Sequence, residues 1–346
     1  MVECSSKLSV ALAPCALGFR QSSCEVRLDD FSTKSEHTKT LVTAVTDTAA
    51  WTGFDFVIHI SAPAMWMSTE GSDRVLRWEV GMRKKTVSRP KSSMQSKLSY
   101  GWKPDLPDRR DLRYGAVRPI PAKLPDKVDL RPLCSRVENQ GDLNSCTGNA
   151  LAGALEFLEN KDKLRCVNLS RLFIYYNERV MEHSVQSDDG AYIRDGIKTL
   201  VKQGVCHESK WPYTESKWKA RPNTACYQQA LQHQVTKYAR LHTVDEMRTC
   251  LADGYPFVFG FSVYESFESQ DVAKTGVLSM PGPHERATGG HAVLCVGYDD
   301  KEKWFIVRNS WGTKWGMKGY FSMPYEYLAS RDLSDDFWTI RRGEQI

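Results

Sequence analysis

The sequence predicts an α+β fold with two lobes, one of helices and one of strands. Helical periodicity dominates residues 146–203, and short alternating or continuous apolar runs dominate from residue 257 onward. No internal repeat is found. The 346 residues are 41% hydrophobic and 26% charged, which is enough apolar material for a sizeable core.

Helices are expected where apolar residues recur at i, i+3, i+4 and i+7 between recognisable ends. Ser170 is a good N-cap, Gly204 is a helix stop, and Thr243 with Glu246 forms a capping box. The expected helices cover residues 146–159, 170–181, 191–203 and 243–254. Strands are expected in the apolar runs bounded by glycine or charge, at residues 257–263, 291–298, 304–308 and 320–323.

The N-terminal quarter, residues 1–92, shows no sustained periodicity and is assigned to no domain. It is either a leader or an extension that is not part of the true protein. Met82, followed by three basic residues, is an alternative start. The apolar stretch 8–17 has the length of a signal-peptide core, but Glu3 and Pro14 argue against one, so the compartment stays open. No stretch of about 20 uncharged apolar residues occurs, and no membrane span is expected.

Residues 93–123, called the strap below, are rich in proline and basic residues. Residues before proline favour extended backbone, which predicts an extended segment and not a helix. The strap is either a linker or a segment lying against the following domain, residues 124–346. The net charge of +5 is local, because residues 83–135 hold 14 Lys and Arg against 5 Asp and Glu. We therefore expect no nucleic-acid partner, and interpret the basic run 83–97 as solvated.

The ten cysteines contain no Cys-x-x-Cys pair, so neither a zinc site nor any other metal or cofactor is expected. One cysteine has a distinctive setting. Cys146 begins the first expected helix, and a helix N-terminus with a nearby imidazolium lowers a thiol pKa. His291 opens a later strand, so that only folding could bring it to Cys146. Asn309 ends the next strand, where its amide would orient the imidazole. Gln140 and the Cys146 backbone N–H would form an oxyanion hole.

Gln140, Cys146, His291 and Asn309, in this order, resemble the papain family of cysteine proteases. The Cys-to-His separation falls in the roughly 130–150 residues expected of that family. Further matches lie at Leu124–Arg131, Gly289–Val293 and Asn309–Gly312, and the likeness covers about residues 124–325.

The resemblance implies a two-lobed fold, with Cys146 in a helical lobe and His291 and Asn309 in an antiparallel, β-barrel-like lobe. It implies Cys146 as nucleophile, His291 as base and then acid, and a monomeric enzyme acting on peptides or proteins. Trp311 would shield the His291–Asn309 contact from water. The backbone around Gly190, Ala191 and Gly290 would bind the substrate.

Two departures from the family pattern stand beside Cys146. Leu143 replaces one half of the usual disulfide, and Thr147 replaces a bulky aromatic residue. Both are similar to the bacterial branch of the family. The substrate preference therefore cannot be carried over.

Alternatives to an endopeptidase stay open at this point. A related acyl transferase or amidase would use the same Cys-His-Asn set with a different acceptor. A catalytically inactive binding module on the same fold is the third possibility. The strap could also inhibit the enzyme by covering its active site, which predicts higher activity after its deletion.

Overall fold

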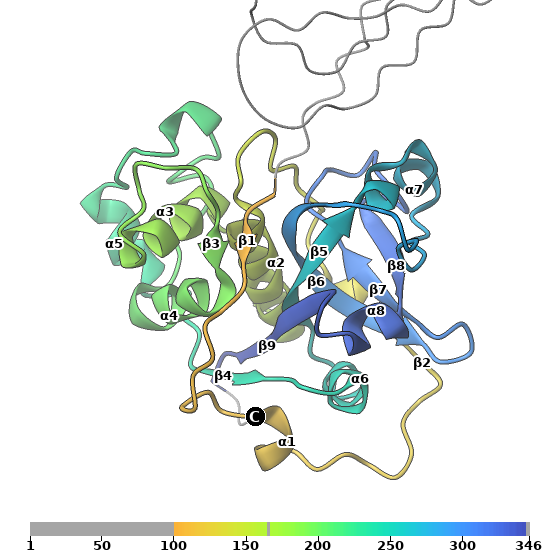
Figure 1. The fold of residues 1–346 in the computed structure, drawn as a ribbon. Helices are drawn as coiled ribbons and strands as arrows, with labels where there is room; N and C mark the ends of the chain where they lie inside the picture. The colour runs from red at the N-terminus through yellow and green to blue at the C-terminus, as the bar shows by residue number, and fades with distance from the viewer. Residues whose placement is uncertain (1–99, 165–166, 344–346) are drawn as a thin grey trace, which may run out of the picture. The chain divides into compact units, whose positions relative to one another are not determined.

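The structure is a computed structural model that describes residues 100–164 and 167–343 (Figure 1). The expectations for residues 1–92 and for the start of the strap lie outside these residues. The helices are α1 Tyr114–Val117, α2 Cys146–Lys161, α3 Arg171–Met181, α4 Ile193–Gln203, α5 Thr224–Ala230, α6 Val244–Ala252, α7 Gln270–Thr275 and α8 Tyr325–Ala329. The strands are β1 Trp102–Lys103, β2 Lys127–Asp129, β3 Ala191–Tyr192, β4 Lys237–Arg240, β5 Phe257–Tyr264, β6 Ala287–Asp299, β7 Trp304–Arg308, β8 Tyr320–Pro324 and β9 Ser334–Arg341.

The α+β prediction is confirmed. Helices α2 to α5 gather on one side of the described fold, and the large sheet lies on the other (Figure 1). That sheet is antiparallel, in the order β4-β9-β5-β6-β7-β8, and β2 pairs with β6. A separate two-stranded parallel sheet joins β1 to β3.

Helix α2 is the centre of the described fold, buried along almost its whole length. Two glycines let neighbours approach its backbone closely. A Cβ on Gly148 would stand 2.8 Å from the carbonyl oxygen of Arg171, and one on Gly153 would stand 3.3 Å from the guanidinium carbon of Arg308. The slim helix can therefore pack against α3 on one side and the sheet on the other.

The expected helix ends have the predicted physical causes. The Ser170 hydroxyl accepts the backbone N–H of Phe173, and Thr243 accepts that of Glu246. Gly204 ends α4 with a φ of 69°. The third helix begins two residues later than expected, because Ala191 and Tyr192 pair as β3 with the strap.

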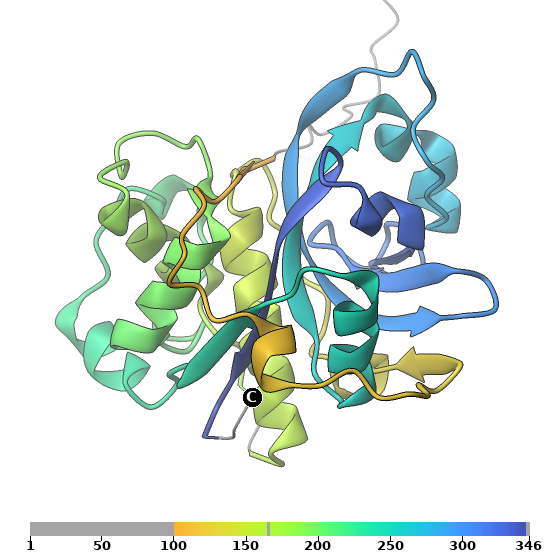
Figure 2. The ribbon, with the colours of Figure 1, turned by 60° about the horizontal axis from the view of Figure 1, so that its bottom comes forward.

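The prediction of a strap without a helix is wrong at one place. The strap runs extended between the helices and the sheet, then forms the short helix α1 (Figure 2). This four-residue helix contains no proline, and Tyr114 anchors it. The Tyr114 ring is buried, and its hydroxyl donates to Asp253 at 2.8 Å.

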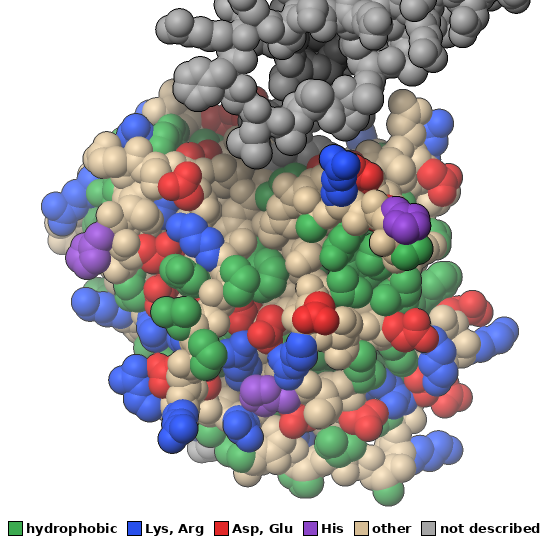
Figure 3. Space-filling model, viewed as in Figure 1, with side chains coloured by type: hydrophobic (Ala, Val, Ile, Leu, Met, Phe, Trp, Pro, Cys, Tyr) green, Lys and Arg blue, Asp and Glu red, His purple; other side chains and the backbone are tan. Residues whose placement is uncertain are grey.

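The structure adds strands that the sequence analysis did not anticipate, namely the short β1 and β3 and, in the large sheet, β2, β4 and β9. Strand β9 lies inside the sheet between β4 and β5. Its pattern is obscured because it buries charged residues, Asp336 and Arg341, among aromatic ones. On the face drawn in Figure 3, positive and negative side chains are interspersed, without one dominant sign.

Candidate active site

Cys146 is the first residue of α2 and is fully buried. The backbone N–H of Ala292 donates to its sulfur at 3.3 Å. Ala292 follows His291 directly in β6, so the thiol contacts the strand at the residue after the histidine. Burial raises the Cys146 pKa to about 12, and the N–H groups of Ala292 and Gly101 only partly offset this. The lowered pKa that the sequence predicts is not found in this arrangement, because the effect of burial outweighs that of the backbone N–H donors.

His291 and Asn309 meet as predicted. The Nε2 atom of His291 lies 2.8 Å from Oδ1 of Asn309, and the same oxygen accepts the Ser310 backbone N–H at 2.8 Å. An oxygen acceptor requires a proton on Nε2, so the neutral ring carries its lone pair on Nδ1. That Nδ1 has no hydrogen-bond partner among the described residues. Burial lowers the pKa of His291 to about 4, so the imidazole is neutral here.

Trp311 lies where the sequence predicts a shield. Its indole stacks on the His291 ring, with ring centroids 5.0 Å apart and planes inclined by 28°. The rings of Tyr100 and Phe261 stand nearly perpendicular to the same imidazole, at interplanar angles of 80° and 70°. Aromatic rings thus surround the His291 imidazole, and Asn309 is its hydrogen-bonding partner.

Gln140 is held in one orientation by three hydrogen bonds. Its side-chain Nε2 donates to the carbonyl oxygen of Leu143 at 2.9 Å, and its Oε1 accepts from the Ser310 hydroxyl at 2.6 Å. Its backbone N–H donates to the carbonyl of Ser310 at 2.9 Å. Ser310 was missed as a site residue, although it stands directly after Asn309, because its role depends on a contact across the lobes.

The strap occupies the positions expected to bind substrate. The N–H of Ala191 donates to the Gly101 carbonyl at 2.7 Å, and the N–H of Gly101 donates to the Gly290 carbonyl at 3.0 Å. A Cβ on Gly190, whose φ is +80°, would overlap the Gly101 carbonyl. Residues 100–103 therefore bridge β3 and β6 by backbone pairing, as the strap passes between the lobes in Figure 1.

Tyr100 is the strap residue that contacts the aromatic rings around His291. Its hydroxyl donates to Glu268, and its ring centroid lies 6.0 Å from that of His291 and 6.2 Å from that of Trp311. The sequence analysis gave no role to Tyr100, because nothing local in the strap marks the residue that crosses the junction.

The two departures from the family pattern are accommodated locally. Leu143 is buried and belongs to a small apolar cluster with Leu172 and Ala191. The Thr147 hydroxyl donates to Oε2 of Glu178 at 2.8 Å. Glu178 is fully buried, and burial raises its pKa to about 8.

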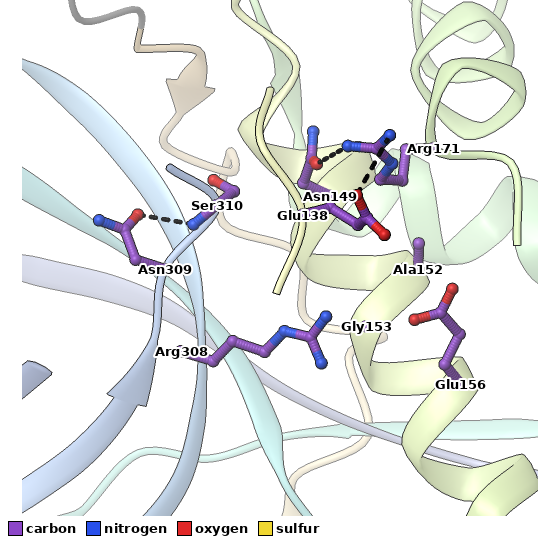
Figure 4. Close-up of a pocket in the computed structure, with 9 residues that line it drawn as sticks. All are labelled: Glu138, Asn149, Ala152, Gly153, Glu156, Arg171, Arg308, Asn309 and Ser310. Atoms are coloured by element: carbon purple, nitrogen blue, oxygen red, sulfur yellow. Dashed lines mark hydrogen bonds and ion pairs between the residues drawn. The ribbon is translucent and has the colours of Figure 1, made fainter. Parts of the chain in front are cut away.

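A small polar pocket lies behind the catalytic candidates, between α2 and the end of β7 (Figure 4). Arg308 extends from β7 toward Gly153 on α2 and donates to the carbonyl groups of Ser135 and Arg136. On the other side, Arg171 donates to Oδ1 of Asn149 at 3.1 Å. The Arg308 bonds tie β7 to the segment that precedes α2, and the Arg171 bond ties α3 to α2.

Within residues 100–164 and 167–343, no cluster of three or more His, Cys, Asp or Glu residues is arranged to hold a metal ion. Over the same residues, no helix has the length and apolar character of a membrane span.

Comparison with known proteins agrees with this geometry. The model of the papain family of cysteine proteases matches residues 124–332. Xylellain, a cysteine protease from Xylella fastidiosa, is similar in structure, with a TM-score of 0.68 and 44% identity over 71% of this chain and 97% of its own. An uncharacterized peptidase C1-like protein, L477, of Acanthamoeba polyphaga mimivirus is 43% identical, over 70% of this chain and 86% of its own length.

A more distant relative is the cathepsin B-like CP3 of Giardia intestinalis, 28% identical over 75% of this chain and 89% of its own. The likeness to xylellain supports the bacterial branch expected from the sequence. The mimivirus protein is similar to this chain at nearly the same sequence identity. The family model covers more than half of the 346 residues, and the chain belongs to the papain family of cysteine proteases.

Proposed function

We propose that this papain-family protease is an endopeptidase that uses Cys146, His291, Asn309 and Gln140. One observation carries the proposal. Asn309 accepts a hydrogen bond from the Nε2–H of His291, so the lone pair of the His291 Nδ1 atom has no partner among the described residues. This is the tautomer that a base for the thiol requires. The next residue in the sequence, Ala292, donates its backbone N–H to the Cys146 sulfur.

In the proposed reaction, Nδ1 of His291 takes the proton of the Cys146 thiol, and the sulfur attacks the peptide carbonyl carbon. The C–N bond breaks, and the imidazolium gives its proton to the leaving amine. Water, activated by the same imidazole, then hydrolyses the thioester and restores the thiol. The backbone N–H of Cys146 and the amide of Gln140 would stabilise the oxyanion, each donor contributing ~2.7–4 kcal/mol.

We further propose that the strap keeps the enzyme latent. The backbone pairing of Gly101 with Ala191 and Gly290, together with the burial of Cys146, supports this role. A neutral thiol and a neutral imidazole in a dry site would not react until the strap leaves.

The test compares wild type with Cys146→Ala on a panel of fluorogenic peptides, with an epoxide-type thiol inactivator as the label. We expect turnover and stoichiometric labelling of Cys146 after displacement of the strap, and neither in Cys146→Ala. Product analysis with an added amine identifies a transferase. Absence of both turnover and labelling after strap displacement would leave an inactive binding module.

A further inference from the structure

Asp188 lies just before strand β3 in the sequence and contacts the segment that leads into helix α2. Its carboxylate accepts the backbone N–H of Asn144, with Oδ1 and Oδ2 at 3.3 and 3.2 Å from the nitrogen. Its backbone carbonyl accepts from Nδ2 of the same asparagine. Both residues are half-buried. Side chain and backbone of Asp188 therefore hold Asn144, which stands two positions before the nucleophile Cys146.

The start of α2 depends on such an external contact. Ser145 is its N-cap residue, but the Ser145 side chain accepts no N–H of the helix and lies 2.6 Å from the Tyr213 hydroxyl instead. The first N–H groups of a helix have no partner within the helix, and the N–H of Cys146 is one of them. The cysteines of the described residues are all free, so no disulfide fixes this segment. Its direction is set by the bonds that Asn144 and Ser145 make.

Asp188 is itself fixed from helix α3. Tyr175 of α3 is fully buried and donates its hydroxyl to Oδ1 of Asp188. The buried Arg179 guanidinium lies 4.0 Å from the centroid of the Tyr175 ring. Arg179 also donates to the carbonyl groups of Val185 and Ser187, at 3.2 and 3.3 Å. These bonds fix the loop that ends at Asp188 without using the segment before α2, so the carboxylate is already in place to receive an N–H group.

Strand β3, where substrate is expected to bind, has an anchor of its own. The N–H of Tyr192 donates to Oε1 of Glu182 at 2.8 Å. Loss of the Asp188 carboxylate would leave that bond in place, so the backbone that pairs with substrate should keep its position. The consequence of such a loss should therefore fall on the N–H of Cys146 and not on substrate binding.

We propose that Asp188 is a positioning residue, which holds the backbone N–H of Cys146 in the direction that the oxyanion requires. The inference rests on the proposed function, because it names the residue that positions one donor of the proposed oxyanion hole. The charge that this donor stabilises develops only in the transition state, so a misplaced donor lowers kcat with little change in KM. A misplacement of about 1 Å can cost roughly 100-fold in rate.

The test compares full-length chains that all carry Trp102→Ala, called the parent below. This change is used to displace the strap, because the Nε1–H of Trp102 anchors it by donating to Oδ2 of Asp336 at 2.9 Å. Rates are expressed per active site, counted with the epoxide-type inactivator, so that a loss of folded enzyme does not enter kcat. We expect Asp188→Ala to lower kcat roughly 10- to 100-fold with little change in KM. Asp188→Asn keeps an oxygen that can accept the Asn144 N–H and should recover most of the loss.

Two further substitutions supply the controls. Asp189→Ala removes the exposed carboxylate of the next residue and should leave kcat near that of the parent. Tyr175→Phe should lower kcat in the parent but cost almost nothing further in a chain that already carries Asp188→Ala, because the hydroxyl acts through Asp188.

Hydrogen exchange, followed by mass spectrometry on the same chains, adds a measurement that needs no turnover. Peptides covering residues 143–147 should exchange faster in Asp188→Ala than in Asp189→Ala, whereas peptides of β3 should exchange alike. Unchanged exchange at 143–147, an unchanged kcat per active site, or a loss confined to KM would each overturn the inference. So would an Asp188→Asn chain as impaired as Asp188→Ala. A parent that neither turns over nor is labelled, but shows the exchange difference, would refute the proposed endopeptidase while supporting the hold of Asp188 on Asn144.

Discussion

Gly101 of the strap lies so close to Asn144 that a Cβ at position 101 would overlap the Asn144 carbonyl oxygen. The obstacle is backbone and cannot rotate away, so Gly101→Ala should displace the strap from the residues around Cys146. We expect the full-length variant to hydrolyse fluorogenic peptides at least tenfold faster than the untreated wild type. The initial rate, measured without a protease pretreatment, checks this.

A second strap glycine offers the matched control. A Cβ on Gly115 would meet only the carboxylate of Glu246, the far end of a flexible side chain. Gly115→Ala should therefore leave the initial rate near that of wild type. Equal rates for Gly101→Ala and wild type, with the variant folded by circular dichroism, would contradict a masking role for the strap.

The stability with which the strap is held in place, called its grip below, should depend on pH through Asp105. Burial and the charge of Asp336 raise the pKa of Asp105 to about 7 from its ordinary 3.8. The seated strap thus prefers the protonated acid, although Arg194 opposes the shift. The grip should be strongest below about pH 4 and weaken as the pH rises to about 7.

One preparation is incubated at pH 5 and at pH 8, and samples taken over time are assayed for activity at a common pH. The rate at which activity appears reports release of the strap, here called opening. Opening should be faster at pH 8. Asp105→Asn, which resembles the protonated acid, should remove most of the difference. Faster opening at pH 5 than at pH 8 would be the opposite of this expectation and would refute the role of Asp105 in holding the strap.

The part of this molecule that sequence could predict is the part encoded locally. Caps such as Ser170 and Thr243, and the motif residues Cys146 and His291, carry their signals within a few positions. The path of the strap could not be predicted in the same way. Trp102 has meaning only because Asp336 faces it from 234 positions away.

Strand β9 could not be predicted for a related reason, which is that its buried charges depend on partners far away in the sequence. Its buried charges are acceptable only because Asp336 meets Arg240 and because the Arg341 guanidinium lies 3.5 Å from the Tyr255 ring centroid. In sequence, these charges resemble an exposed tail. The partners of these buried groups come from other segments of the chain, Arg240 from β4 and Tyr255 from the loop before β5, and no periodicity within 334–341 reveals them.

His291 should stay neutral while the strap is seated. Because burial lowers its pKa to about 4, the ring of the wild-type chain should not titrate between pH 8 and pH 5. In Gly101→Ala, water and a thiolate would favour the imidazolium, and the pKa should rise. Nitrogen chemical shifts of labelled histidine, assigned with His291→Gln, report this. A wild-type ring that titrates between pH 6 and pH 7 would refute the dry, neutral site.

Ser310 should act as a positioning residue for the oxyanion donor. Its hydroxyl donates to Oε1 of Gln140 at 2.6 Å and so fixes which end of the amide presents N–H groups. In the strap-displaced Gly101→Ala chain, Gln140→Ala should lower kcat by roughly 100–1,000-fold. Ser310→Ala should lower kcat by about tenfold with little change in KM, and Ser310→Thr, which keeps a hydroxyl, should recover most of the loss.

Coupling between these two side chains gives the decisive measurement. If Ser310 works only through Gln140, then Ser310→Ala should cost almost nothing further in a chain that already carries Gln140→Ala. The hydrogen bond predicts a strongly non-additive cycle in kcat. A purely structural role of Ser310 would instead lower stability and activity equally in both backgrounds, and additive losses would exclude the positioning role.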